Sequence, residues 1–235
     1  ACLCLPLSKN LSSTKGLEAR KAALEVIQAV GGGAFADIAL ERIFNFYSFK
    51  SIDKALITEL SYGSIRYRYF LDCWIDFLGK VPAKKQPPRL RWLLHLGLYQ
   101  IFRMERIPPA AAINTTVELA KISDFKKLAP VVNGILRSAL RKKEKGLLLP
   151  KSNNPSLELA KNESLPLWLA DELIEWRGVQ DAKKIAKAFN SISPIDLRVN
   201  KLRADLKDVK ETFDSCGIQA QLIPNCPYGL EVRAG

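Results

Sequence analysis

The spacing of apolar residues constrains the fold of this chain more than any other feature. Ala23, Val26, Ile27 and Val30 lie three and four residues apart, so they share one face of a helix. The same spacing recurs as far as residue 144. It predicts helices at about 17–30, 35–48, 53–79 with a break near Gly63, 89–105, 108–122 and 127–144. The sequence therefore predicts a compact all-helical domain over residues 17–145.

A linker is predicted to follow this domain. Residues 146–164 are interrupted by Pro, Asn and Ser, which favour turns and irregular structure. Two further amphipathic helices are expected at about 166–177 and 180–190.

The apolar pattern then changes from a helical to an alternating period. Ile195, Leu197 and Val199 alternate with polar residues, which is typical of a half-buried strand. A short helix and two more strands are expected at about 206–213, 218–222 and 230–232. This order is the start of a small α/β subdomain that needs at least one more element to close. The fold class is thus mainly α, with an incomplete α/β piece at the end.

Charge is distributed unevenly along the chain. The net charge is +12, and residues 1–146 hold 24 of the 36 Lys and Arg but only 12 of the 24 Asp and Glu. Residues 147–235 are therefore neutral. A basic excess confined to one domain indicates a polyanionic partner such as a nucleic acid or an anionic membrane surface. The alternative is a solvated basic surface with no specific partner.

The basic residues fall into clusters that suit phosphate contacts. One cluster spans residues 80–91 and another spans residues 137–145, and Arg66 and Arg68 alternate with Tyr67 and Tyr69. Cations beside aromatic rings suit phosphate contact combined with base stacking. Arg20 and Lys21 are expected on the polar side of the first helix. The candidate RNA-binding residues from these clusters and the first helix are Arg20, Lys21, Arg66, Arg68, Lys80, Lys84, Lys85, Arg89, Arg91, Arg137, Arg141 and Lys142.

No residue pattern predicts catalysis or metal binding. The single histidine, His95, lies in the most hydrophobic helix and is expected to be packed or hydrogen-bonded there. The run Gly31–Gly33 follows a helix instead of a strand, so it predicts a helix connection and no phosphate loop. The five cysteines lack zinc-site spacing, and Cys73 is expected to be a core thiol. No metal is expected, and no apolar run is long enough for a membrane span.

Several segments resemble the NusB-like RNA-binding domain, in the version fused to rRNA cytosine-5 methyltransferases of the Sun/Fmu type. The segments are ARKAALEVIQAVGGGAFADIAL (19–40), ELSYGSIRYRYFLD (59–72), LRWLLHLGLYQIFRMERIPPAAAINTTVELAK (90–121) and VVNGILRSALR (131–141). LPLWLADELIEW (165–176) and LRVNKLRADLKDVKETFDSCGI (197–218) resemble the next module of those enzymes. The resemblance adds Asn133 to the candidate RNA-binding residues, although Asn133 and Gly134 could equally serve helix packing.

The resemblance implies a NusB-like bundle, then a ferredoxin-like or RRM-like subdomain. It also implies methyl transfer from S-adenosylmethionine to C5 of a cytosine in 16S rRNA, through a cysteine thiolate that adds to C6 of the base. The family's Thr-Cys-Ser-like and Pro-Cys motifs and its glycine-rich cofactor loop do not occur here. No catalytic or cofactor-binding residue is therefore assigned in this chain. By itself it is expected to bind RNA without binding S-adenosylmethionine or methylating.

Two other functions are also compatible with the sequence. A NusB-type transcription antitermination factor with an appended domain would share residues 1–145, and a protein-docking role is a further alternative. Residues 1–16 are expected to be a disordered tail or the remnant of a transit peptide. A monomer in the bacterial cytoplasm is predicted, with a plastid as the alternative.

Overall fold

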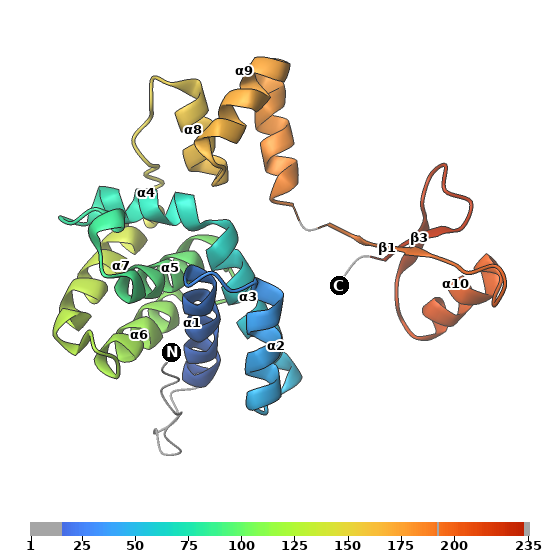
Figure 1. Ribbon diagram of the computed structural model, residues 1–235, viewed down its shortest axis with the longest axis horizontal. Helices are drawn as coiled ribbons and strands as arrows, with labels where there is room; N and C mark the ends of the chain where they lie inside the picture. The colour runs from blue at the N-terminus through green and yellow to red at the C-terminus, as the bar shows by residue number, and fades with distance from the viewer. Residues whose placement is uncertain (1–15, 192, 233–235) are drawn as a thin grey trace. The chain divides into compact units, whose positions relative to one another are not determined.

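The computed structural model describes residues 16–191 and 193–232, so the predicted tail lies outside the described residues except for Gly16. The chain divides into two compact units, Ala1–Lys187 and Ala188–Gly235. The first unit is helical and the second holds a small sheet (Figure 1).

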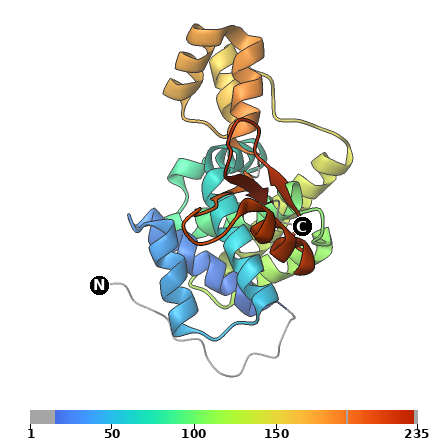
Figure 2. The ribbon, with the colours of Figure 1, turned by 90° about the vertical axis from the view of Figure 1, so that its right-hand side faces the viewer.

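The first unit contains the predicted helical bundle. Its helices share one apolar core, in which α1 packs against α3 and α5, and α5 packs against α6 and α7. Figure 2 shows α2 alongside α1 and α3. The helices of the bundle are α1 (Leu17–Gly31), α2 (Ala36–Phe46), α3 (Ser51–Arg66), α4 (Arg68–Leu78), α5 (Pro88–Arg103), α6 (Pro109–Lys121) and α7 (Ala129–Glu144).

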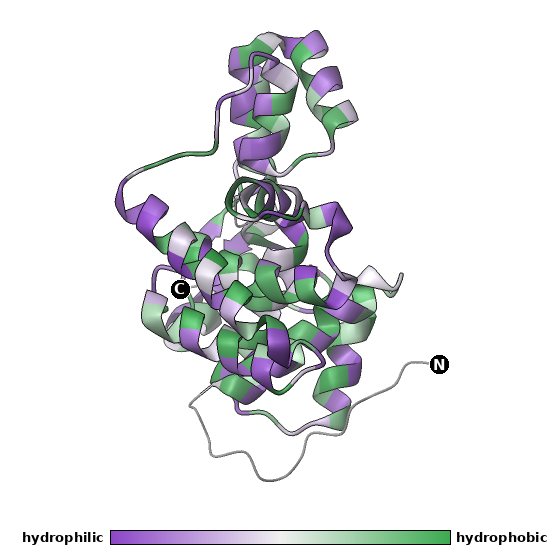
Figure 3. Cartoon of the chain, turned by 90° about the vertical axis from the view of Figure 1, so that its left-hand side faces the viewer, coloured by the Kyte–Doolittle hydropathy of each residue, from purple (hydrophilic) through white to green (hydrophobic). Residues whose placement is uncertain are grey.

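Helix α5 is the centre of the bundle. Every residue from Trp92 to Ile101 is buried, including His95. Figure 3 shows the other helices with apolar residues on one side and polar residues on the other, as amphipathic helices around a shared core require. The periodic pattern therefore predicted both the helices and the most buried one among them.

Two glycines allow close approaches that fix the packing around α5. A Cβ added at Gly63 of α3 would lie 2.0 Å from Cζ of Tyr99, and one at Gly97 would lie 2.8 Å from Cδ2 of Leu136. The break predicted near Gly63 lies four residues further on, because α3 continues to Arg66 and the chain bends at Tyr67. Gly63 serves contact with the Tyr99 ring and does not end the helix.

The expected linker contains a helix. Residues 155–163 form α8 (Pro155–Glu163), whose first turn is capped by the side chain of Asn154. Ser164 then accepts hydrogen bonds at its Oγ from the backbone N–H groups of Tyr69 and Phe70, at the start of α4. The irregular linker is thus shorter than predicted, because α8 packs against α4 within the first unit.

The two helices expected at 166–177 and 180–190 are present as the two halves of α9 (Leu167–Phe189), which are separated by a kink at Gly178. Gly178 has a φ of 73°, which favours glycine. Leu165, Ala170, Leu173 and the α8 residue Leu159 form a small separate core.

The second unit is the predicted strand–helix–strand–turn–strand piece. It contains β1 (Ile195–Arg198), α10 (Leu206–Ser215), β2 (Ala220–Leu222) and β3 (Gly229–Val232). The strand order is β1-β3-β2, and both pairings are antiparallel, with Leu197 and Leu222 each opposite Leu230. Leu230 is fully buried, whereas Leu197 and Leu222 at the two edges stay exposed. Helix α10 packs beside β2, and its residues Leu206, Val209 and Phe213 cover the small core that contains Leu230.

Candidate nucleic-acid interface

The exposed face of α7 carries one group of the predicted basic residues. Arg137 and Arg141 lie one helical turn apart and are exposed, and Lys145 continues their row. Lys142 is half-buried, with its ammonium 4.4 Å from the ring centre of Phe77 in α4. Because Phe77 lies close to the end of α4, this contact places the α7 row beside the chain that leads to Lys80.

Asn133 lies in the same helix and contacts Arg137. Its Oδ1 accepts a hydrogen bond from Nε of Arg137 at 3.0 Å. Asn133 therefore orients the guanidinium of Arg137, which leaves the other nitrogens of that group free to donate.

The loop between α4 and α5 holds the next predicted group. Lys80, Lys84 and Lys85 are exposed, and the last two lie in a short 3₁₀ turn, η1 (Ala83–Lys85). Arg89 in the first turn of α5 forms an ion pair with Asp124, with 3.0 Å between Nη1 and Oδ2. Both side chains of this pair are exposed, so its contribution to stability is small.

Arg91 belongs to a partly buried ion pair, in which its own side chain is 23% exposed. It donates two hydrogen bonds to the carboxylate of Asp72 in α4, and His95 Nε2 lies 2.8 Å from the Oδ1 atom of the same carboxylate. The Asp72 side chain is 11% exposed and that of His95 is 0%. This network joins α4 to α5. Because the Arg91 guanidinium is engaged in it, Arg91 is a poor candidate for RNA contact. The expectation that His95 is packed and hydrogen-bonded is confirmed.

Burial shapes the pKa of both partners. Burial lowers the pKa of His95, and the Asp72 carboxylate only partly opposes this effect. Burial would raise the pKa of Asp72, but hydrogen bonds from His95 and Arg91 outweigh it and hold that pKa below its usual value. At neutral pH the imidazole is neutral and donates from Nε2. The buried Nδ1 then has no hydrogen-bond partner among the described residues.

These directions predict loss of stability in acid. Unfolded His95 binds a proton below its ordinary pKa of 6.5, whereas the folded protein resists protonation, so the free energy of unfolding falls as pH drops below that value. A further fall follows when Asp72 protonates, below about 4. Urea unfolding at pH 7.5 and 5.5 measures the first step. His95→Gln keeps an N–H donor but cannot titrate, so it should remove most of the difference, and an unchanged difference would contradict the assignment.

Arg66 and Arg68 flank the bend between α3 and α4 and are both exposed, as expected. The neighbouring ring of Tyr67, however, packs against other side chains of the protein. Tyr67 stacks on Tyr99, with ring centres 6.0 Å apart, and the guanidinium of Arg103 lies 4.2 Å from the centre of the Tyr67 ring. The predicted base stacking at Tyr67 is thus disfavoured, while the side chains of Arg66 and Arg68 are exposed at the surface.

The placement of Arg20 on the polar side of the first helix is wrong. Arg20 is 5% exposed, and its Nε donates to Oε1 of Gln100 in the buried centre of α5 at 2.7 Å. Its Nη1 donates to the carbonyl oxygen of Gly16. A guanidinium held in this way joins α1 to α5 and cannot reach a phosphate. Lys21 is half-buried and lies near Glu25.

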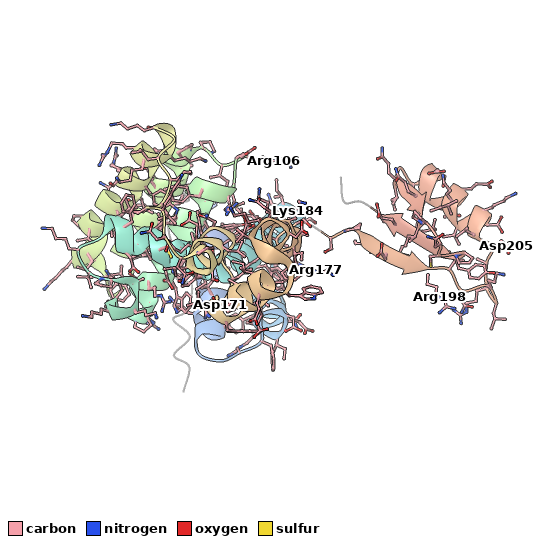
Figure 4. The ribbon with its side chains drawn as sticks, turned by 90° about the horizontal axis from the view of Figure 1, so that it is seen from above. Arg106, Asp171, Arg177, Lys184, Arg198 and Asp205 are labelled. Carbon is pink, nitrogen blue, oxygen red and sulfur yellow. The ribbon has the colours of Figure 1, made fainter. Side chains whose placement is uncertain are left out.

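Other exposed cations were missed by the sequence reasoning. Lys126 and Lys127 lie in a second 3₁₀ turn, η2 (Lys126–Leu128), immediately before α7. The adjacent lysine pair was the signal that could have found them. Figure 4 shows Arg106 projecting from the loop after α5, Arg177 and Lys184 from α9, and Arg198 from the second unit.

The described residues offer no metal site and no membrane span. Within 16–191 and 193–232, no group of three or more His, Cys, Asp or Glu could hold a metal ion, and no helix is long and apolar enough to cross a membrane. Burial raises the pKa of the Cys73 thiol to about 11, so that thiol stays protonated near neutral pH and is a poor nucleophile.

Two stretches of the described residues bear comparison with the glycine-rich loop that the resemblance implies for S-adenosylmethionine. Strand β1 leads into α10 through residues 199–205, which contain no glycine, and Gly31–Gly33 follows helix α1. A glycine-rich strand–loop–helix that could cradle such a cofactor is therefore not found in the described part of the chain.

Comparison with known proteins also divides the chain into two parts, the second of which begins within the first structural unit. Residues 17–141 match the model of the NusB family, and residues 165–235 match the ferredoxin-like domain of the RsmF/B-like methyltransferases. The fold of the chain is also similar to the crystal structure of PH0851, with a TM-score of 0.63, 16% identity and coverage of 97% of this chain and 50% of that one. That likeness concerns the fold alone.

Two curated relatives are similar over most of this chain. The probable ribosomal RNA small subunit methyltransferase B of Synechocystis sp. is 31% identical over 217 residues, covering 92% of this chain and 48% of the relative. The protein of the same description from Bacillus subtilis is 32% identical over 208 residues, covering 88% and 46%. The chain thus spans about half the length of these relatives.

The fold and the matches define a helical bundle of the NusB class joined to a ferredoxin-like module of the RsmF/B-like methyltransferases. The chain belongs to the NusB family through residues 17–141. Residues 165–235 carry the RsmF/B-like ferredoxin-like domain.

Proposed function

We propose that this chain is the RNA-binding portion of an S-adenosylmethionine-dependent methyltransferase that modifies C5 of a cytosine in 16S rRNA. The observation that carries the proposal is the succession of a NusB-family bundle and an RsmF/B-like ferredoxin-like domain in one chain. The names of the similar relatives agree with this succession. It favours the enzyme over a NusB-type antitermination factor, because such a factor does not require the second module.

In this proposal the basic bundle holds the RNA and the chemistry lies outside these 235 residues. The exposed cations of the α4–α5 loop and of α7 contact phosphates, which fixes the RNA without reading its sequence. Arg66 and Arg68 extend the contact surface at the bend between α3 and α4. We place the protein in the bacterial cytoplasm as a monomer, with a plastid as the alternative.

Binding without methyl transfer is the expected behaviour of the chain. Labelled fragments of 16S rRNA are titrated with the protein at 50 mM salt, and the same mixture receives S-adenosylmethionine carrying a tritiated methyl group. We expect a complex and no tritium in the RNA. A complex that fails to form contradicts the RNA-binding proposal, and tritium in the RNA contradicts the placement of the catalytic residues outside the chain.

A further inference from the structure

Two lysine pairs lie in separate turns of the bundle that an ion pair joins. Lys84 and Lys85 lie in η1, and Lys126 and Lys127 lie in η2. The Arg89–Asp124 pair links the chain just after η1 to the chain just before η2. These four lysines define what is called here the four-lysine end of the bundle.

Both turns are held by contacts that do not involve the lysine side chains. In the first turn, the backbone N–H of the fully buried Ala83 donates to Asp76 Oδ1 at 2.6 Å, and Gln86 Nε2 donates to the Val81 carbonyl at 2.9 Å. In the second turn, Ser123 Oγ accepts from the N–H of Phe125. Each lysine pair is thus presented from an ordered backbone.

The second turn is anchored from both sides. Ser123 Oγ also donates to the Ala120 carbonyl at the end of α6, and Phe125 packs against the main core. The backbone N–H of Leu128 donates to the Phe125 carbonyl at 2.7 Å, immediately before α7 begins. A turn held in this way loses little conformational entropy when a ligand binds its lysines.

The four-lysine end has almost no acidic counterweight. In residues 79–91 and 120–131 the only acid is Asp124, and Arg89 already pairs with it. All four lysines are exposed, and none of their ammonium groups has an ion-pair or hydrogen-bond partner among the described residues. The positive charge of this end is therefore available to an external anion.

The helix directions add to this positive potential. Helices α5 and α7 both begin at this end, and neither has an acidic residue in its first turn or a side-chain cap. Their N–H groups and dipoles favour negative charge. Helix α6 ends here with the opposite dipole, but its last residue is Lys121, and that ammonium lies 2.7 Å from Oε1 of Glu118.

The lack of exposed aromatic rings in the two segments of the four-lysine end indicates the type of RNA that it binds. Single-stranded RNA is usually held by exposed aromatic rings on which bases stack. Here Phe125 is packed against the core and Trp92 is buried, so these segments present no exposed ring. Double-helical RNA is instead held through phosphates and 2′-hydroxyl groups. We propose that the four-lysine end binds the sugar–phosphate backbone of double-helical RNA, an inference that rests on the proposed function.

The test compares two RNAs and two variants of the whole chain. The probes are a hairpin with a stem of about 16 base pairs and an unstructured oligouridine with the same number of nucleotides. The test variant replaces Lys84, Lys85, Lys126 and Lys127 by alanine. The control variant replaces four other exposed lysines, Lys50, Lys183, Lys187 and Lys207, and so removes the same charge. Circular dichroism confirms that both variants are folded.

We expect the wild type to prefer the hairpin. The test variant should bind the hairpin about 100-fold more weakly, and the slope of log affinity against log salt should fall by about 3, since each lost phosphate contact removes close to one unit. The control should keep most of the affinity and the slope. Equal losses in both variants, or a preference for oligouridine, would overturn this inference while leaving RNA binding intact. No binding of either RNA by the wild type would instead remove the proposed function.

Discussion

Gly63→Ala should lower the free energy of unfolding of the helical domain by about 3 kcal/mol, because overpacking of a tight core displaces neighbouring groups. The new Cβ would lie 2.0 Å from Cζ and 2.1 Å from the hydroxyl oxygen of Tyr99. Tyr99 cannot move away easily. Its ring stacks on Tyr67, and its hydroxyl donates to Glu59 Oε1 at 2.5 Å. Urea denaturation followed by circular dichroism measures the change.

Gly134→Ala is the matched control for this substitution. Gly134 also lies inside a helix, but a Cβ added there meets nothing within 4 Å. Alanine should therefore stabilise the protein by up to about 1 kcal/mol through its higher helix propensity. Similar effects at the two positions would mean that the contact between α3 and α5 is not as close as described.

Asp72→Ala should destabilise the protein by about 3 kcal/mol, because removing the less exposed partner of a partly buried ion pair leaves its partners uncompensated. Two groups lose their acceptor at once, the guanidinium of Arg91 and the buried Nε2 of His95. Urea denaturation at pH 7.5 measures the loss.

The control for the partly buried pair is Asp124→Ala, which removes an exposed partner of Arg89. The two side chains of that pair are 45% and 71% exposed, so the expected loss is below about 1 kcal/mol. A loss at Asp72 no larger than the loss at Asp124 would contradict the role given to the Asp72 network. The two losses also compare Arg91, which is held in a network between helices, with Arg89, which is in an exposed ion pair.

The helices of the bundle could be predicted from sequence because each has a buried stripe at a helical period. The same stripe could have corrected the placement of Arg20, since Arg20 precedes Ala23, Leu24 and Ile27 by three, four and seven residues. Its charge suggested a polar face, but a partner in α5 satisfies that charge in the interior.

The remaining differences come from contacts between distant residues. Arg91 and Asp72 are 19 residues apart, and Gly63 and Tyr99 are 36 apart, so no local pattern announces either contact. The short α8 is missed for a similar reason: residues 155–163 have a weak local signal and become a helix by packing on α4.

The candidate interface was predictable in composition and less so in detail. The clusters at 80–91 and 137–145 do contain exposed cations, but the structure assigns Arg91 to an internal ion pair. Lys126 and Lys127 join the surface because the fold brings their turn to the same end of the bundle, where Arg89 pairs with Asp124. Which of these cations contact RNA stays a prediction.

The salt dependence of RNA binding tests the central claim most directly. The affinity of the chain for a labelled 16S rRNA fragment is measured by fluorescence anisotropy between 50 and 200 mM salt. If the basic bundle holds RNA through six or more phosphates, the affinity should fall by about 1,000-fold or more over this range. An affinity that changes less than about threefold, or no complex at 50 mM salt, would contradict the account.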